Sequence, residues 1–150
     1  MFDRTVLPRV LVVDDESIIA DTLVLILNKS GYEATAAYSG EQALELAPMI
    51  EPDVLISDVA MKGIDGIETA IRITGELPEC RVVLFSGQAH TADLLHEATA
   101  KGYTFEVLRK PVAPAVLLNH VHSLLGSSSV KASPGPQSEE RSLISLARDN

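Results

Sequence analysis

Five short apolar runs alternate along the chain with longer segments that carry a helical pattern. The runs cover residues 10–13, 33–37, 54–57, 82–85 and 105–108. The first, third and fourth runs are apolar throughout instead of alternating with polar residues, which is typical of strands buried on both faces of a parallel sheet. The alternation therefore predicts an α/β protein whose helices cover both faces of one sheet.

The segments between the runs show helix patterns with recognisable ends. Gly31 is expected to end the first helix as a C-cap, and Pro48 is expected to stop the second. Helices are expected over residues 17–30, 39–48, 64–76, 91–101 and 114–125. Five right-handed βα units most simply form a doubly wound, flavodoxin-like three-layer sandwich, (βα)5, with the parallel strand order 2-1-3-4-5.

The length and composition fit one folded domain followed by a tail. A chain of 150 residues with 46% hydrophobic and 22% charged residues has the balance of a globular protein with one core. Residues 1–125 are expected to form that domain. Residues 126–150 are rich in serine and proline and are expected to be a flexible tail, with a short C-terminal helix from Ser138 as the alternative.

Charge and hydrophobicity exclude several classes of protein. The formal net charge of −9 disfavours direct binding to nucleic acid or to an anionic membrane surface, because both need basic residues. The chain has no run of about 18 apolar residues for a membrane helix and begins without a secretory signal pattern, so a cytoplasmic location is expected. Its one cysteine, Cys80, can form neither an internal disulfide nor a zinc cluster.

Polar residues directly follow four of the predicted strands. They are Asp14, Asp15 and Glu16 after the first strand, Asp58 after the third, Ser86 after the fourth and Lys110 after the fifth. In the expected strand order, the carboxyl ends of these strands meet at one edge of the sheet, near the point where the winding reverses. Three aspartate carboxylates, a hydroxyl and an ammonium group are therefore expected to converge there.

The clustered carboxylates predict a metal site. Like charges at short range repel one another unless a cation is present. Mg²⁺ binds a few carboxylates together with water and phosphate oxygens, so two or three Asp in an open crevice suit it. With the metal in place, an Asp can attack a phosphoryl donor and form an aspartyl phosphate, while a Lys neutralises the phosphoryl oxygens.

Four sequence motifs end predicted strands. They are Val12-Val13-Asp14-Asp15-Glu16, then Ile56-Ser57-Asp58-Val59-Ala60-Met61 with Gly63-Ile64-Asp65-Gly66 behind it, then Phe85-Ser86-Gly87, then Lys110-Pro111. Each motif alone is weak, but all four occur in order and at equivalent places in the fold. Together they resemble the response-regulator receiver family of two-component signalling, over residues 8–125.

The resemblance implies how such a site would work. Asp58 would be the phosphoacceptor, phosphorylated by a histidine kinase or a phosphotransfer protein. Asp14 and Asp15 would bind Mg²⁺ together with Asp58 and the backbone carbonyl of Ala60. A downstream protein effector would then respond to the altered binding surface.

The resemblance also implies roles for other residues around the phosphoryl group. The Ser86 hydroxyl would follow the phosphoryl group, and Lys110 would be its ion-pair partner. The peptide bond to Pro111 is expected to be cis, which turns Lys110 inward. Ala60 and Gln88 are expected to flank the path of the hydrolytic water and to set the lifetime of the phosphoryl group.

Two positions depart from the family pattern. Lys62 stands where the family often has a proline after the methionine, and only a local change in the loop is expected from it. Val107 stands where the family usually has an aromatic residue whose rotamer reports phosphorylation. Phe105 lies on the same strand face two residues earlier and could take part, or the signal could pass through the loop after Ser86 and the fourth helix.

Other functional classes remain open at this point. A degenerate receiver that serves only as a docking module is favoured by Val107 but opposed by the intact set of Asp58, Ser86 and Lys110. An aspartate-nucleophile phosphatase would need Asp-x-Asp after its first strand, where Glu16 occupies the third position. A flavin protein would need amide and hydroxyl donors in place of the acidic first loop. The chain is therefore expected not to be an enzyme beyond its own phosphoryl transfer and hydrolysis, and homodimer formation is left open.

Overall fold

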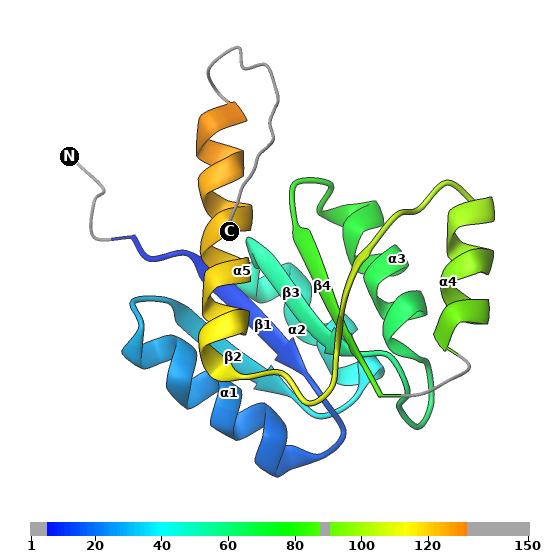
Figure 1. The fold of residues 1–150 in the computed structure, drawn as a ribbon, viewed down its shortest axis with the longest axis horizontal. Helices are drawn as coiled ribbons and strands as arrows, with labels where there is room; N and C mark the ends of the chain where they lie inside the picture. The colour runs from blue at the N-terminus through cyan, green and yellow to red at the C-terminus, as the bar shows by residue number, and fades with distance from the viewer. Residues whose placement is uncertain (1–5, 88–90, 132–150) are drawn as a thin grey trace. The chain divides into compact units, whose positions relative to one another are not determined.

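The computed structural model describes residues 6–87 and 91–131 of the chain. Its strands are β1 (Arg9–Val13), β2 (Glu33–Ala37), β3 (Val54–Asp58), β4 (Arg81–Ser86) and β5 (Glu106–Arg109). They form one parallel sheet in the order β2-β1-β3-β4-β5 (Figure 1). The fold class and the strand order predicted from the sequence are confirmed.

In the described residues, a helix follows each strand. The helices are α1 (Ser17–Lys29), α2 (Gly40–Ile50), α3 (Gly66–Glu76), α4 (Thr91–Ala100) and α5 (Pro114–Lys131). α1 ends as expected, because Gly31 adopts a φ of 97° behind the C-cap residue Ser30. α3 begins at Gly66 instead of Ile64 because Asp65 is its N-cap, and the Asp65 carboxylate accepts a hydrogen bond from the Glu68 N–H at 2.8 Å.

α2 ends near Pro48, as expected, but not at the proline itself. The helix runs through Pro48 to Ile50, and its C-cap Glu51 has a φ of 53°. A proline removes one backbone donor from the helix but leaves the later donors in place, and the Glu51 N–H still bonds to the Ala47 carbonyl at 2.8 Å. The helix therefore ends at a left-handed residue rather than at the proline.

α5 also extends further than expected, to Lys131 instead of about Leu125. The boundary of the flexible tail, expected at Gly126, therefore lies inside a helix. Serine lowers helix stability only modestly, so the serines after Gly126 do not end the helix, and the first proline beyond it is Pro134. Residues 132–150, for which a short C-terminal helix is the alternative, lie outside the described residues.

The chain divides into two compact units, Met1–Leu118 and Asn119–Asn150. The first unit contains the sheet and α1–α4 in three layers, with α1 against β1 and β2 on one face and α2–α4 on the other (Figure 1). Leu11 and Leu55 are fully buried beneath α2 and α3. Within the described part of the chain, no helix is long and apolar enough to cross a membrane.

Candidate functional site

Three aspartates gather at the carboxyl edge of the sheet. Asp58 is the last residue of β3, and Asp14 and Asp15 directly follow β1, the neighbour of β3. One carboxylate oxygen of each residue lies within 4.8 Å of the others. The structure therefore brings together the three carboxylates that the strand order places at this edge.

Asp14 is held rigidly at the end of β1. The residue is only 1% exposed, and its backbone N–H donates a hydrogen bond to the Ala37 carbonyl at 3.1 Å. Its Oδ1 accepts a hydrogen bond from the Glu16 N–H at 2.9 Å. Its Oδ2 is buried and finds no hydrogen-bond donor among the described residues. Because a buried carboxylate oxygen without a donor is costly, this atom is suited to meet a cation.

Lys110 brings a positive charge into the cluster. Its Nζ lies 3.1 Å from Asp58 Oδ1 and 3.6 Å from Asp14 Oδ2. Its backbone N–H donates a hydrogen bond to the Ser86 carbonyl at 2.9 Å, which ties the end of β5 to the end of β4. The Lys110–Pro111 peptide bond is cis, as expected from the sequence. One ammonium group faces three carboxylates, so the cluster keeps a negative charge.

The pKa values of Asp58 and Lys110 reflect this setting. Burial is the main cause that raises the pKa of Asp58; Lys110 lowers it in part, and the charges of Asp14 and Asp15 raise it again. Burial lowers the pKa of Lys110, but the hydrogen bond and attraction to Asp58, with the charge of Asp14, outweigh burial and leave that pKa raised. Lys110 is therefore charged, and the Asp58 carboxylate would gain from a second cation.

Two further predicted residues, Ser86 and Ala60, lie beside residues of this cluster. Ser86 is buried at the end of β4, one residue beyond Phe85, which pairs with Asp58 across the sheet. Ala60 lies in the loop after β3 and lines the same hollow as Asp15. Gln88 lies outside the described residues, so its predicted place beside the water path is not described here.

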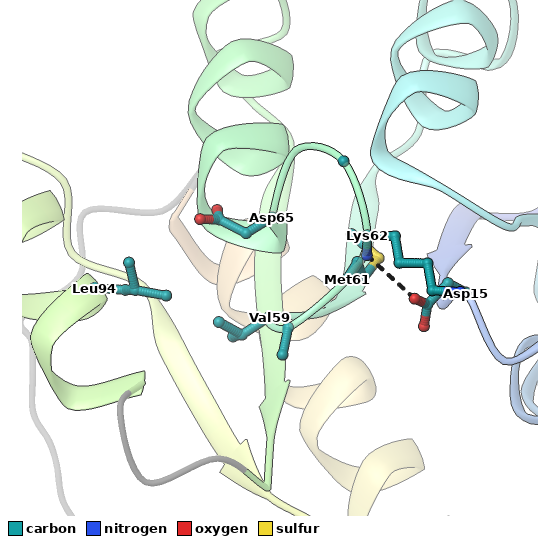
Figure 2. A pocket seen from close by; sticks show the side chains of 8 residues that line it. Asp15, Val59, Met61, Lys62, Asp65 and Leu94 are labelled. Carbon is teal, nitrogen blue, oxygen red and sulfur yellow. Dashed lines mark hydrogen bonds between the residues drawn. The ribbon is translucent and has the colours of Figure 1, made fainter.

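The hollow opens beside Asp15, between the β3–α3 loop and α4, and has a volume of about 530 Å³ (Figure 2). Its apolar lining includes Val59, Met61 and Leu94. Figure 2 shows the Asp15 carboxylate directed at the loop, where its Oδ2 accepts a hydrogen bond from the Lys62 backbone N–H at 3.2 Å. The loop that carries Ala60 is thus joined directly to one of the three aspartates.

Glycines and one glutamate fix the β3–α3 loop. A Cβ atom on Gly66 would meet the Asp58 carbonyl oxygen, so glycine lets α3 begin directly against the end of β3. Glu41 Oε2 accepts a hydrogen bond from the Ile64 N–H at 3.1 Å. The Gly63/Gly66 pair belongs to a motif visible in the sequence, whereas no sequence pattern links Glu41 to a loop 23 residues away.

Comparison with known families gives one match over most of the chain. The family model of the response regulator receiver domain matches residues 10–122. The chain belongs to this family. It is therefore a receiver domain of the kind found in two-component response regulators, and the resemblance drawn from the four sequence motifs is confirmed.

Solved receiver structures are similar over most of the chain. A response regulator receiver domain protein from Clostridium thermocellum is 28% identical, over 83% of this chain and 99% of that one, with a TM-score of 0.74. TrrA from Thermotoga maritima, in complex with Mg²⁺-BeF, is 32% identical over 78% of this chain and 98% of that one, with a TM-score of 0.67. The Vibrio cholerae chemotaxis protein CheY4 is 29% identical over 79% and 98% of the two chains, with a TM-score of 0.68.

The donor set of this receiver fits a magnesium ion. The clustered ligand atoms are all carboxylate oxygens, with no histidine or cysteine in the group. Such hard oxygen donors suit Mg²⁺, which keeps several waters in an octahedral shell. The buried Oδ2 of Asp14 has no hydrogen bond within the described residues and only the Lys110 ammonium 3.6 Å away, so a metal cation could satisfy it further.

The region around β5 differs from the family pattern at Val107. Val107 and Phe105 are half-buried and pack against a cluster that includes Val59 and Leu84. The Phe105 ring stacks on Tyr103 with ring centroids 6.0 Å apart. An aromatic ring is therefore present two residues before Val107, but it is engaged with another ring.

Proposed function

We propose that this receiver is a phosphoacceptor of a two-component phosphorelay, phosphorylated on Asp58 in a magnesium-dependent reaction. The observation that carries the proposal is the position of the Asp58 carboxylate, 3.1 Å from Lys110 Nζ and within 4.8 Å of carboxylate oxygens of Asp14 and Asp15. A carboxylate nucleophile, a fixed ammonium group and a pair of acidic metal ligands are the parts that phosphoryl transfer to aspartate needs.

The side chains of the site would act on the phosphoryl group directly. A carboxylate oxygen of Asp58 attacks the phosphorus atom of a phosphohistidine, and the bond from phosphorus to the histidine nitrogen breaks. The leaving imidazole keeps the electron pair and takes up a proton. Lys110 neutralises charge on the phosphoryl oxygens and Ser86 donates a hydrogen bond to one of them. Attack by water later releases phosphate and restores the Asp58 carboxylate.

Asp14, Asp15, Asp58 and the Ala60 carbonyl would hold the Mg²⁺ ion. When bound, the metal neutralises charge on the phosphoryl oxygens as a Lewis acid. The buried Oδ2 of Asp14 supports this set. The complex of TrrA with Mg²⁺-BeF, in a protein 32% identical, supports the same role in this chain.

The partners of the proposed reaction are proteins. A histidine kinase or a phosphotransfer protein in the cytoplasm would supply the phosphoryl group, and a downstream protein effector would bind the phosphorylated form. The net charge of −9 argues against direct binding of this chain to nucleic acid. Catalysis would be limited to phosphoryl transfer onto Asp58 and its hydrolysis, with Ala60 and Gln88 setting the lifetime of the phosphoryl group.

A change of aromatic rotamer cannot transmit phosphorylation at position 107, because Val107 has no ring. We propose that α4 moves instead, since it packs near Val107 through Leu94 and Leu95. The loop after Ser86, which the sequence also suggests for this role, includes residues 88–90, which lie outside the described residues. Structures with and without a phosphoryl mimic would show the movement of α4, and unchanged backbone positions in α4 would contradict it.

Phosphorylation with a small donor tests the proposed function. The protein is incubated with Mg²⁺ and acetyl phosphate, and intact mass is compared between the wild type, Asp58→Asn and Asp93→Asn. Asp93 is an exposed aspartate in the first turn of α4 and serves as the matched control. One added phosphoryl group in the wild type and in Asp93→Asn, but not in Asp58→Asn, is expected. No incorporation at saturating donor would favour a phosphorylation-independent docking module.

A further inference from the structure

Glu41, in the first turn of α2, contacts the β3–α3 loop beside the site. We propose that Glu41 is a positioning residue for the phosphorylation site, which holds this loop in the conformation that contacts Asp15. The inference rests on the proposed function, because the proposed function assigns the binding of Mg²⁺ to Asp15 and Ala60 among others. Its physical basis is the hydrogen bond from the Ile64 N–H to Glu41 Oε2 at 3.1 Å.

The loop is held between carboxylates from two elements. The Lys62 N–H donates a hydrogen bond to Asp15 Oδ2 at 3.2 Å (Figure 2), and the Ile64 N–H donates to Glu41. Gly63 lies between these two donors with a φ of 78°, and a Cβ atom there would stand 2.5 Å from Glu41 Oε2. Glu41 therefore occupies the space beside the turn and fixes the direction in which the Lys62 N–H points.

The start of α2 is a firm support for Glu41. The Ser39 side chain caps the helix by accepting a hydrogen bond from the Gln42 N–H at 2.9 Å. A Cβ atom on Gly40 would collide with the side chains of Ile64 and Thr69, so the first turn of α2 lies directly against the loop and α3. The carboxylate is thus placed by packed backbone, although its own side chain is exposed.

The consequence falls on two proposed metal ligands. Asp15 receives one hydrogen bond from the loop, which orients its carboxylate, and Ala60 belongs to the same loop. Groups that orient metal ligands change metal affinity when they are removed, even though they do not touch the metal. Without Glu41, the loop would sample other conformations, and Mg²⁺ binding would have to select the correct one.

Three variants separate the hydrogen bond from the charge. Glu41→Ala removes the acceptor, Glu41→Gln keeps an amide oxygen as acceptor without the charge, and Glu45→Ala removes an equal charge from an exposed position one turn further along α2. Mg²⁺ affinity is measured by NMR amide shifts, and hydrogen exchange of the Lys62 and Ile64 amides is measured without metal. Glu41→Ala is expected to weaken Mg²⁺ binding about fivefold, below the usual range for such groups because the side chain is exposed. We expect faster exchange at both amides in this variant, near-normal behaviour in Glu41→Gln and no change in Glu45→Ala.

Several results would overturn the inference. One is an unchanged Mg²⁺ affinity together with unchanged amide exchange in Glu41→Ala. Another is an equal loss of Mg²⁺ affinity in Glu45→Ala. A third is a Glu41→Gln variant that binds Mg²⁺ as weakly as Glu41→Ala does, which would indicate a simple charge effect. Failure of the proposed function looks different, since the wild type itself would then bind no Mg²⁺ through Asp58. The exchange measurement still decides the role of Glu41 in that case, because it needs no metal.

Discussion

The surroundings of Asp58 destabilise the charged form of its carboxyl group. Burial raises its pKa, the nearby ammonium group of Lys110 lowers it, and the charges of Asp14 and Asp15 raise it again. The folded protein therefore takes up a proton on Asp58 at a higher pH than the unfolded chain does. As the pH falls from the raised pKa of folded Asp58 toward its pKa in the unfolded chain, the free energy of unfolding rises. In this range the native state binds a proton on Asp58 that the unfolded chain does not yet bind.

The titration of Asp58 is predicted to depend on Lys110. The midpoint of the Asp58 titration in the wild type is expected to lie above the ordinary aspartate value of 3.8, and the Lys110→Ala variant is expected to raise it further by removing a favourable charge partner. Carbon NMR of the Asp58 carboxyl group measures both midpoints without Mg²⁺. Lys101→Ala, which removes an exposed lysine, is the control. A midpoint that stays the same in Lys110→Ala would contradict the assigned charge coupling.

The sequence predicts the charged residues of the site better than the contacts that place them. Asp14 and Asp58 stand directly after apolar runs and Lys110 stands two residues after one, so the strand order alone brings them together. The contacts of the Lys62 amide and of Glu41 could not be predicted from the sequence, for a physical reason. A backbone N–H has no sequence signature, and the bond from Ile64 to Glu41 depends on how α2 packs, which no local pattern encodes.

At the scale of elements, the start of α3 determines how closely that helix approaches the phosphoacceptor strand. The Gly66 N–H donates a hydrogen bond to the Val59 carbonyl at 2.8 Å, and the Gly66 Cα faces the Asp58 carbonyl oxygen. A side chain at this position would push the helix away from β3. Gly75, in the last turns of the same helix, has open space around it.

These two glycines are predicted to respond in opposite directions to alanine. Gly66→Ala is expected to lower the free energy of unfolding by about 2 kcal/mol, because the added methyl group meets backbone that cannot move freely. Gly75→Ala is expected to raise it by about 0.5 kcal/mol, because alanine restricts the unfolded chain and favours a helix. Urea denaturation followed by circular dichroism measures both. Equal effects at the two positions would show that backbone approach at Gly66 is not what requires glycine.

The element boundaries show where sequence patterns mislead. Gly31 ends α1 as predicted because a positive φ is a local requirement that glycine meets. The serines after Gly126 are weak stops, since a helix tolerates serine at a modest cost. Pro48 is a strong helix breaker, but it lies in the last turn of α2, where the helix ends two residues later. The order of the elements follows from hydrophobic patterning, whereas the last turn of a helix depends on its neighbours.

At the scale of the whole molecule, folding brings the acidic side chains together, and their mutual repulsion destabilises the folded state. The chain carries a net charge of −9, and Asp14, Asp15 and Asp58 concentrate part of it around one ammonium group. Repulsion within the cluster exists mainly in the folded state, because unfolding separates the three residues. A cation that binds only the folded cluster must therefore stabilise the entire first unit, not just the site.

Mg²⁺ is accordingly predicted to raise the melting temperature of the protein. At a free concentration about 100-fold above Kd, the folded state should gain about 2.7 kcal/mol. Asp58→Asn should lose most of this gain while melting higher than the wild type without metal, because it removes a buried charge that the cluster repels. Calorimetry with NaCl at matched ionic strength separates binding from screening. An equal rise with NaCl, or an equal rise in Asp58→Asn, would mean that Mg²⁺ acts on the overall charge and that the three aspartates do not form a metal site.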